Sequence, residues 1–233
     1  HMVAYGLGNV IFLWNLLIEM YGRCGVLQYS RAAFDQMPER TACSWNIMIS
    51  AYISCGKKGE AQLLFEQMHE SEEGVDEITV IMILNICANE HALVNGRYVH
   101  SRVIAFGFES DLVVGTALMN MYGRCKSLDD AQRAFEKLQE RDMVSWNSLI
   151  GLQVHIRFLV DAFHTYEKMK EEGFLPDFVT FLSLLEASSI LADLCEGRIM
   201  HSGIVNAGYE NIIVVSNALI NMYSKCGSLE DAT

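Results

Sequence analysis

The apolar residues of this chain follow a helical spacing that is broken by short polar turns. From Ile11 onward they recur every three or four positions, which predicts an amphipathic helix of about 12 residues. Its apolar stripe consists of Leu13, Leu17, Ile18 and Tyr21. Gly25 is suited to end this helix, and a second helix follows, with Phe34 on its apolar side and Pro38 just beyond its end. The pattern therefore predicts a helical hairpin.

The hairpin pattern repeats along the chain. A shift of 101 residues places Trp45-Asn46 on Trp146-Asn147. The same shift places residues 21–24 on residues 122–125, and a second shift places them on residues 223–226. Helical repeats are single supersecondary units of about 20 to 50 residues, so a period of this length is a composite of several units.

Cutting the period into single hairpins produces units of 31, 35 and 35 residues. Residues 1–10 align with the end of such a unit, and His1-Met2 looks like the remnant of a cloning site. Because one hairpin cannot bury its apolar faces alone, we expect an all-α solenoid in which the hairpins stack as one domain and their first helices share a surface. The predicted units are 11–41, 42–76, 77–111, 112–142, 143–177 and 178–212, followed by a truncated seventh unit at 213–233.

One position of the second helix is small in every complete unit, four residues before the position of Phe34. A small side chain there lets neighbouring helix axes approach closely, whereas a leucine would overpack the hairpin at a cost of about 1 to 3 kcal/mol. The residues at this position are Ser30, Ala61, Gly96, Ala131, Ala162 and Gly197.

Composition narrows the classes of function. A net charge of -12 argues against a generic polyanion binder, although a few well-placed cations can act locally. The seven cysteines include no CxxC pair, and Cys24, Cys125 and Cys226 occupy one slot of successive copies, so we expect reduced, buried thiols. No apolar run approaches the roughly 18 residues that a membrane span needs, and we expect no membrane contact.

The motifs within the units are Trp-Asn-x-x-Ile near the start, Tyr-x-x-Cys-Gly at the end of the first helix and Phe-x-x-Met in the second helix. In this combination the chain resembles the pentatricopeptide repeat family over nearly its whole length. The 31/35/35 rhythm is similar to the plant subclass of short, standard and long repeats, known as PLS. By this resemblance 11–41, 112–142 and 213–233 are short, 42–76 and 143–177 standard, and 77–111 and 178–212 long.

The resemblance implies that the fifth and the last residue of each unit read one base of single-stranded RNA. Amide, hydroxyl and carboxylate groups can complement a base edge, which agrees with this expectation. The family uses the pairs Asn46 with Asp76 and Asn147 with Asp177 for uracil, and Thr116 with Asp142 for guanine. Asn15 with Thr41 departs from the usual pairs, and Asn217 has lost its partner to truncation. In the long units the fifth residues are Ile81 and Leu182, which cannot hydrogen-bond.

The resemblance implies two further kinds of RNA contact. The second residue of each unit would sandwich the bases by apolar contact, and a cation near the end of the first helix would contact a phosphate. The expected base-sandwiching residues are Phe12, Cys43, Val113, Val144 and Val214. The expected phosphate contacts are Arg23, Arg124 and Lys225.

Simpler interpretations apply to the same residues. An asparagine near a helix start or an aspartate at a unit boundary is often only a cap or turn residue. Trp14, Trp45 and Trp146 lie on the stripe that faces the second helix, so we expect them in the core and not stacked on bases. We expect the same of His100 and His201, which occupy the aromatic position of the second helix.

The sequence does not indicate an enzyme, and it predicts neither a metal nor a cofactor. Zinc deamination needs His-x-Glu and Pro-Cys-x-x-Cys, and neither motif is present. There is also no GxxxxGK[ST] loop and no HExxH motif.

The resemblance favours an RNA-binding module that is the specificity segment of a mitochondrial or chloroplast factor for C-to-U editing. The RNA would run 5′ to 3′ along the chain as n-U-n-G-U-n-pyrimidine. The alternative is a protein-interaction scaffold similar to tetratricopeptide hairpins. It would bind an editing accessory protein at the long units or self-associate end to end, with little RNA affinity.

Overall fold

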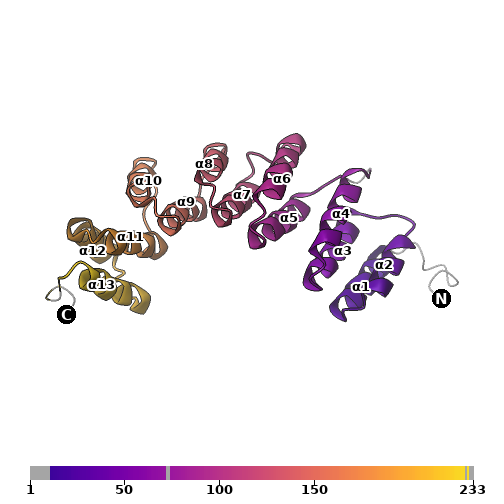
Figure 1. Ribbon diagram of the computed structural model, residues 1–233, viewed down its shortest axis with the longest axis horizontal. Helices are drawn as coiled ribbons and strands as arrows, with labels where there is room; N and C mark the ends of the chain where they lie inside the picture. Colours follow the sequence, from indigo (N-terminus) through magenta and orange to yellow (C-terminus); the bar gives the residue numbers. More distant parts are fainter. Residues whose placement is uncertain (1–10, 72–73, 229, 231–233) are drawn as a thin grey trace. The chain divides into compact units, whose positions relative to one another are not determined.

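The computed structural model describes residues 11–71, 74–228 and 230, and these residues form helices joined by short turns (Figure 1). The chain divides into two compact units, His1–Phe108 and Glu109–Thr233, which are described separately below. The predicted end of a repeat at residues 1–10 lies outside the described residues. The assignment of all repeats to one domain stays a prediction.

The first compact unit contains three antiparallel hairpins. Each pairs a first helix with a second helix, and successive first helices pack side by side, α1 against α3 and α3 against α5 (Figure 1). The helices are α1 (Ile11–Arg23), α2 (Leu27–Asp35), α3 (Ala42–Ser54), α4 (Lys58–His69), α5 (Glu77–Asn89) and α6 (Leu93–Phe106).

The second compact unit continues the same plan with three hairpins and a further first helix. Its first helices α7, α9, α11 and α13 pack in sequence, and each second helix also contacts the first helix that follows it. The helices are α7 (Leu112–Arg124), α8 (Leu128–Glu136), α9 (Met143–His155), α10 (Leu159–Glu171), α11 (Phe178–Leu191), α12 (Leu194–Ala207) and α13 (Ile213–Lys225). The predicted all-α fold of stacked hairpins is thereby confirmed.

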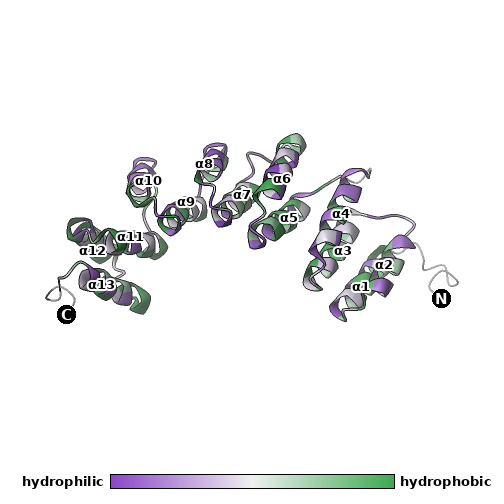
Figure 2. Ribbon diagram, viewed as in Figure 1, coloured by the Kyte–Doolittle hydropathy of each residue, from purple (hydrophilic) through white to green (hydrophobic). Residues whose placement is uncertain are grey.

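The core lies between the two helix layers of each unit, and most helices carry both hydrophobic and hydrophilic residues (Figure 2). The predicted small residues are all buried at the close contacts. Ser30 shows how a polar member of this set is accommodated, since its hydroxyl donates to the carbonyl of Ile18 on the partner helix at 2.9 Å.

The tryptophans are core residues, as predicted. Trp14, Trp45 and Trp146 are buried. Two of them meet a phenylalanine of the preceding second helix edge to face, Trp45 with Phe34 at 4.9 Å and Trp146 with Phe135 at 4.7 Å between ring centroids. Such contacts join one hairpin to the next, because they link the second helix of one to the first helix of the other.

The predicted burial of two residue classes needs correction. Cys24 is exposed, whereas Cys125 and Cys226 are half-buried, because their slot is the C-terminal end of the first helix and not a packed face. His100 and His201 are half-buried as well. His201 places Nδ1 2.7 Å from the hydroxyl of Tyr223.

Most first helices begin at a capping residue that ends the preceding repeat. Thr41, Asp76, Asp142 and Asp177 each accept a hydrogen bond from the backbone N–H three residues later, and Asp111 accepts bonds from the N–H groups two and three residues later. This satisfies a backbone donor that a helix start leaves unpaired. The alternative interpretation of these residues as caps is therefore confirmed, and it places their side chains at the end of the first-helix layer.

Candidate nucleic-acid interface

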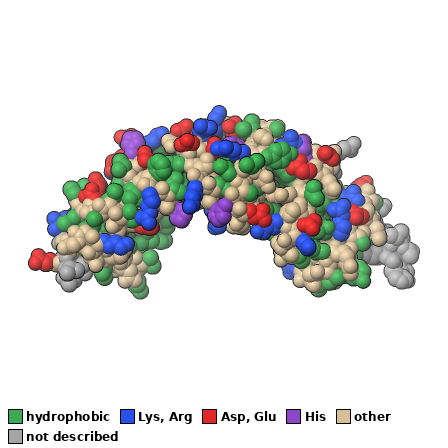
Figure 3. Space-filling view, in the orientation of Figure 1, with side chains coloured by type: hydrophobic (Ala, Val, Ile, Leu, Met, Phe, Trp, Pro, Cys, Tyr) green, Lys and Arg blue, Asp and Glu red, His purple; other side chains and the backbone are tan. Residues whose placement is uncertain are grey.

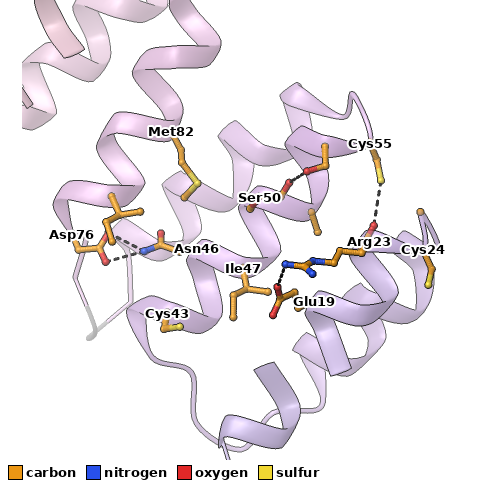
Figure 4. Close-up of a pocket in the computed structure, with 15 residues that line it drawn as sticks. Glu19, Arg23, Cys24, Cys43, Asn46, Ile47, Ser50, Cys55, Asp76 and Met82 are labelled. Atoms are coloured by element: carbon orange, nitrogen blue, oxygen red, sulfur yellow. Dashed lines mark hydrogen bonds and ion pairs between the residues drawn. The ribbon is translucent and has the colours of Figure 1, made fainter. Parts of the chain in front are cut away.

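An open groove of about 840 Å³ runs over the first helices of the first compact unit (Figure 4). Its walls come from α1, α3 and the start of α5. Arg23, Cys43, Asn46 and Asp76 all line it, so one surface holds members of each predicted class of RNA contact.

Asn46 and Asp76 lie together at the edge of this groove (Figure 4). Asn46 Nδ2 donates to the Asp76 carboxylate, at 3.0 Å from Oδ1 and 2.8 Å from Oδ2. The two residues are 30 positions apart in the chain and meet because α3 packs against the start of α5. Both are half-buried, which leaves part of each side chain accessible from the groove.

A third side chain completes this cluster. The Thr79 hydroxyl lies 2.5 Å from Asn46 Oδ1 and 2.6 Å from Asp76 Oδ1, and the Thr79 backbone N–H donates to the same carboxylate oxygen at 2.8 Å. A hydroxyl has one proton, so at any moment it donates to only one of the two oxygens. Burial raises the pKa of the Asp76 carboxyl, and hydrogen bonds from Thr79 and Asn46 lower it by more, so the net effect holds its pKa below the ordinary value of an aspartate.

Asn147 and Asp177 repeat this geometry in the second compact unit. Asn147 Nδ2 donates to the carboxylate at 3.0 and 3.2 Å. The Thr180 hydroxyl lies 2.7 Å from Asn147 Oδ1 and 3.0 Å from Asp177 Oδ1. The same arrangement of asparagine, aspartate and threonine therefore occurs at equivalent positions in both compact units.

Thr116 and Asp142 behave differently. The Thr116 hydroxyl donates to the carbonyl of Leu112 in its own helix at 2.8 Å, and no hydrogen bond joins the two side chains in the described part of the chain. Asp142 caps α9 and shares a capping box with Ser145. Both Thr116 and Asp142 are half-buried. Threonine has no amide group, so the Asp142 carboxylate has no counterpart of the Asn46 amide beside it.

Asn15 and Thr41 are not joined either. Thr41 forms a capping box with Ser44. Asn15 Oδ1 is buried and has no hydrogen-bond partner among the described residues. This pair lacks the acidic cap of the standard units, which agrees with its departure from the usual pairs in the sequence.

The remaining fifth residues differ in exposure. Asn217 is exposed on α13, whereas Ile81 and Leu182 are half-buried. Because these two side chains have no polar atoms, the predicted base-reading position of the long units offers no hydrogen-bonding group.

The second residue of every first helix is exposed, including residues that the sequence analysis did not include. Phe12, Val113, Val144 and Val214 each leave more than half of their surface accessible, and Cys43 is also exposed. Ile78 and Val179 occupy the same position in the long units and are exposed to 61% and 39%. The 101-residue register could have identified both. An exposed side chain, apolar in most units, thus lies at the second position of each first helix.

The three predicted phosphate contacts lie at the C-terminal ends of first helices and are exposed. Arg23 forms an ion pair with Glu19 of the same helix at 2.6 Å, with its side chain 80% accessible (Figure 4). Such an exposed pair contributes little to stability, so Arg23 can exchange its partner for a phosphate at small cost.

The groove presents hydrogen-bonding groups and apolar surface. Within residues 11–71, 74–228 and 230, no group of three or more His, Cys, Asp or Glu side chains could hold a metal ion. In the same residues no helix has the length and apolar character to cross a membrane.

Comparison with family models identifies the repeats. The model described as the PPR repeat and the model described as the pentatricopeptide repeat domain both match the chain. The first matches residues 12–41, 43–72, 116–143 and 214–233, and the second matches residues 140–189.

Relatives in Arabidopsis thaliana match over almost the whole chain. One pentatricopeptide repeat-containing protein is 36% identical over 98% of the chain and 32% of its own length. A second, named as mitochondrial, is 32% identical over 99% of the chain and 22% of its length. A third, named as chloroplastic, is 32% identical over 100% of the chain and 28% of its length. The chain spans about a third or less of the length of these relatives.

Solved structures show the same fold. The pentatricopeptide repeat protein PPR10 in complex with an 18-nt psaJ RNA element matches with a TM-score of 0.73 at 19% sequence identity, over 92% of this chain and 33% of that chain. PPR10 from maize matches in a second structure with a TM-score of 0.68 at 18% identity, over 92% of this chain and 32% of that chain. The fold predicted from the sequence, an all-α solenoid of helical hairpins, is confirmed. Together with the matching models and relatives, this shows that the chain belongs to the pentatricopeptide repeat family.

Proposed function

We propose that the chain binds single-stranded RNA along its first helices and reads single bases at the pairs Asn46–Asp76 and Asn147–Asp177. The observation that carries this proposal is the recurrence of one amide–carboxylate geometry at equivalent, half-exposed places in both compact units. The similarity in fold to PPR10, whose solved structure contains RNA, supports the same class of ligand.

The chemistry of the carboxylate favours particular bases. An ionised aspartate only accepts hydrogen bonds. Uracil and guanine carry a donor N–H at the centre of their Watson–Crick edge, whereas cytosine and adenine carry an acceptor there. A carboxylate such as Asp76 therefore favours uracil and guanine, and the fifth residue separates the two by size. Asparagine reaches a pyrimidine, and the shorter Thr116 leaves room beside Asp142 for a purine.

Exposed apolar residues complete the proposed binding surface. Side chains such as Phe12, Val113 and Val144 lie at the second position of their helices, on the same helices as the fifth residues. Apolar contact with base faces tolerates any sequence, because every base has such a face. These residues would hold the RNA, and the polar pairs would select among bases.

The wider role follows from the family. We propose that this chain is the specificity segment of a factor for C-to-U editing in mitochondria or chloroplasts. One relative is named as mitochondrial and another as chloroplastic, which supports an organellar location. The assignment of the chain to the PLS subclass, with repeats at 11–41, 42–76 and onward, belongs to the same proposal.

A gel-shift experiment at low salt tests the reading of bases. An RNA that contains U-n-G-U should bind more tightly than an RNA of the same composition in which the guanine and its neighbouring uracil are exchanged. The double variant Thr116→Ala, Asn147→Ala is the control, because these two residues face the exchanged bases, and it should bind both RNAs with similar affinity. Equal affinity of the unaltered protein for both RNAs would contradict the proposed reading.

A second candidate function is protein binding by the long units. Their second helices expose apolar side chains, namely Val94, Tyr98 and Ile104 on α6 and Ile199 and Val205 on α12. Hydrophobic side chains are also visible on the surface among charged ones (Figure 3). An editing accessory protein could dock there, and the exposed Ile213 and Ile220 of α13 could support end-to-end self-association. Absence of RNA binding in the gel shift would favour this function.

A further inference from the structure

We infer that Thr79 and Thr180 are positioning residues for base recognition, each fixing the orientation of the asparagine amide in the preceding repeat. The inference rests on the proposed function, because it concerns how the pairs Asn46–Asp76 and Asn147–Asp177 discriminate between bases. It adds a third side chain to each pair, contributed by the third residue of the following repeat.

The geometry is the same at both sites. The two threonines are fully buried, so their hydroxyls are not available to solvent. Each hydroxyl lies within hydrogen-bonding distance of the asparagine Oδ1, at 2.5 Å for Thr79 and 2.7 Å for Thr180. The opposite end of each amide, Nδ2, donates to the aspartate. Each amide is therefore contacted at both ends, and the hydroxyl proton is shared in turn between the asparagine Oδ1 and the aspartate Oδ1.

The orientation of this amide decides what the base encounters. The two ends of an asparagine amide have nearly the same shape, and a flip exchanges a donor for an acceptor. When a uracil N–H donates a hydrogen bond to the carboxylate, the aspartate holds the asparagine Nδ2 less firmly. The buried hydroxyl then remains as the contact that keeps Oδ1 turned inward and an N–H turned to the groove. A flipped amide would present an acceptor, which suits the exocyclic amino group of cytosine.

The other repeats provide internal comparisons. The third residues Ser44, Thr79, Val114, Ser145, Thr180 and Val215 are all buried. Threonine follows the two Asn–Asp pairs, whereas valine follows the units whose fifth residues are Ile81 and Leu182. A hydroxyl at this position thus accompanies a fifth residue that can hydrogen-bond.

Serine at the third position does not make the same contact. The Ser145 hydroxyl donates to the Asp142 carbonyl at 2.8 Å, and the Ser44 hydroxyl contacts Thr41. Ser44 belongs to the repeat that follows Asn15, and Asn15 Oδ1 has no hydrogen-bond partner among the described residues. Threonine is β-branched and has fewer accessible χ1 rotamers than serine, which favours a fixed direction for its hydroxyl. The amide is held where threonine, and not serine, occupies the third position.

The experiment measures selectivity and not affinity alone. Dissociation constants are measured for two RNAs that carry uracil or cytosine at the base of the second repeat, with unaltered protein and with Thr79→Val. The variant keeps the Thr79 backbone N–H that donates to Asp76, the cap of α5, and replaces the hydroxyl with a methyl group. Loss of one hydrogen bond should reduce the uracil-to-cytosine ratio by about 2- to 10-fold. Ser145→Ala is the matched control, because Ser145 has the same position without contacting a fifth residue, and it should leave this ratio unchanged.

The outcomes separate the inference from the proposed function. If the unaltered protein prefers uracil and Thr79→Val retains the full preference, the positioning role is overturned while base reading stands. If Thr79→Val weakens both RNAs equally, Thr79 is only structural and the inference is again overturned. If the unaltered protein has no preference, base reading itself fails. Should Thr79→Val not fold by circular dichroism, Thr180→Val is measured against uracil and cytosine at the fifth repeat and decides between the same outcomes.

Discussion

At the scale of single residues, Asp76 and Asp177 each cap a helix and also take part in the proposed base recognition. Asp76 caps α5 through Oδ1, which accepts the Thr79 N–H, and its other oxygen is contacted by Asn46. Because the cap uses one oxygen, the second remains free to exchange the amide for a base. The cap interpretation and the base-reading interpretation of this residue are therefore compatible.

Exchange of Thr116 for asparagine tests the size argument. Thr116→Asn should shift the preference of the fourth repeat from guanine toward uracil, because the longer amide can reach Asp142 as Asn46 reaches Asp76. Adding Ser145→Thr should increase the shift, since the new hydroxyl would hold the amide. Fluorescence anisotropy with RNAs that differ at this base measures the preference. The preference at the Asn147 repeat serves as control and should not change, and an unaltered preference for guanine would show that this pair does not read.

At the scale of helices, stacking depends on residues without side chains at the contacts. A Cβ on Gly22 would lie 2.6 Å from Ala51 Cβ, where α1 packs against α3. The neighbouring atom is close to the backbone and cannot move aside like the end of a long side chain. The distance between these first helices therefore depends on the absence of a side chain at Gly22.

The substitution Gly22→Ala should destabilise the protein by about 1 to 3 kcal/mol through overpacking. The matched control is Gly151→Ala within α9, where the nearest atom to the added Cβ is Ser183 Oγ at an ordinary 3.8 Å. That variant should gain about 0.5 to 1 kcal/mol, because alanine favours the helix over glycine. Urea unfolding followed by circular dichroism measures both, and equal stability of the two variants would refute the importance of this close approach.

At the scale of the whole molecule, the net charge of -12 bears on the proposed binding of RNA. Lys, Arg, Asp and Glu side chains are interspersed on the visible surface (Figure 3). Long-range attraction to phosphates is correspondingly weak, so in the proposed function local contacts and base stacking supply most of the affinity.

The salt dependence of binding should therefore be shallow. Three phosphate contacts, by Arg23, Arg124 and Lys225, predict a slope of log K against log salt of about -2, from roughly -0.7 for each contact. Arg23→Ala should reduce its magnitude by about 0.7. Arg31→Ala is the control, because Arg31 forms a comparable ion pair with Asp35 but lies on a second helix away from the groove. A slope that Arg23→Ala leaves unaltered would exclude Arg23 from phosphate binding.

The local sequence predicted the helices and much of the candidate surface. The three- and four-residue spacing placed the first helix near Ile11, and the observed helix begins there. The repeat register singled out Asn46 and Asp76, whose side chains meet in the structure. It missed Ile78 and Val179, although they occupy a position that the register already contained.

The sequence by itself determined the hairpins, because helical spacing, caps and turn glycines act between residues that are close in the chain. Only the tertiary structure decided which polar side chains meet. Contacts such as Asn46 with Asp76 and Thr79 span 30 and 33 positions and exist only when one first helix packs against the start of the next. Two pairs of similar appearance in the sequence, Asn46–Asp76 and Thr116–Asp142, therefore differ in space, because hydrogen bonding depends on reach and direction that residue type alone does not specify.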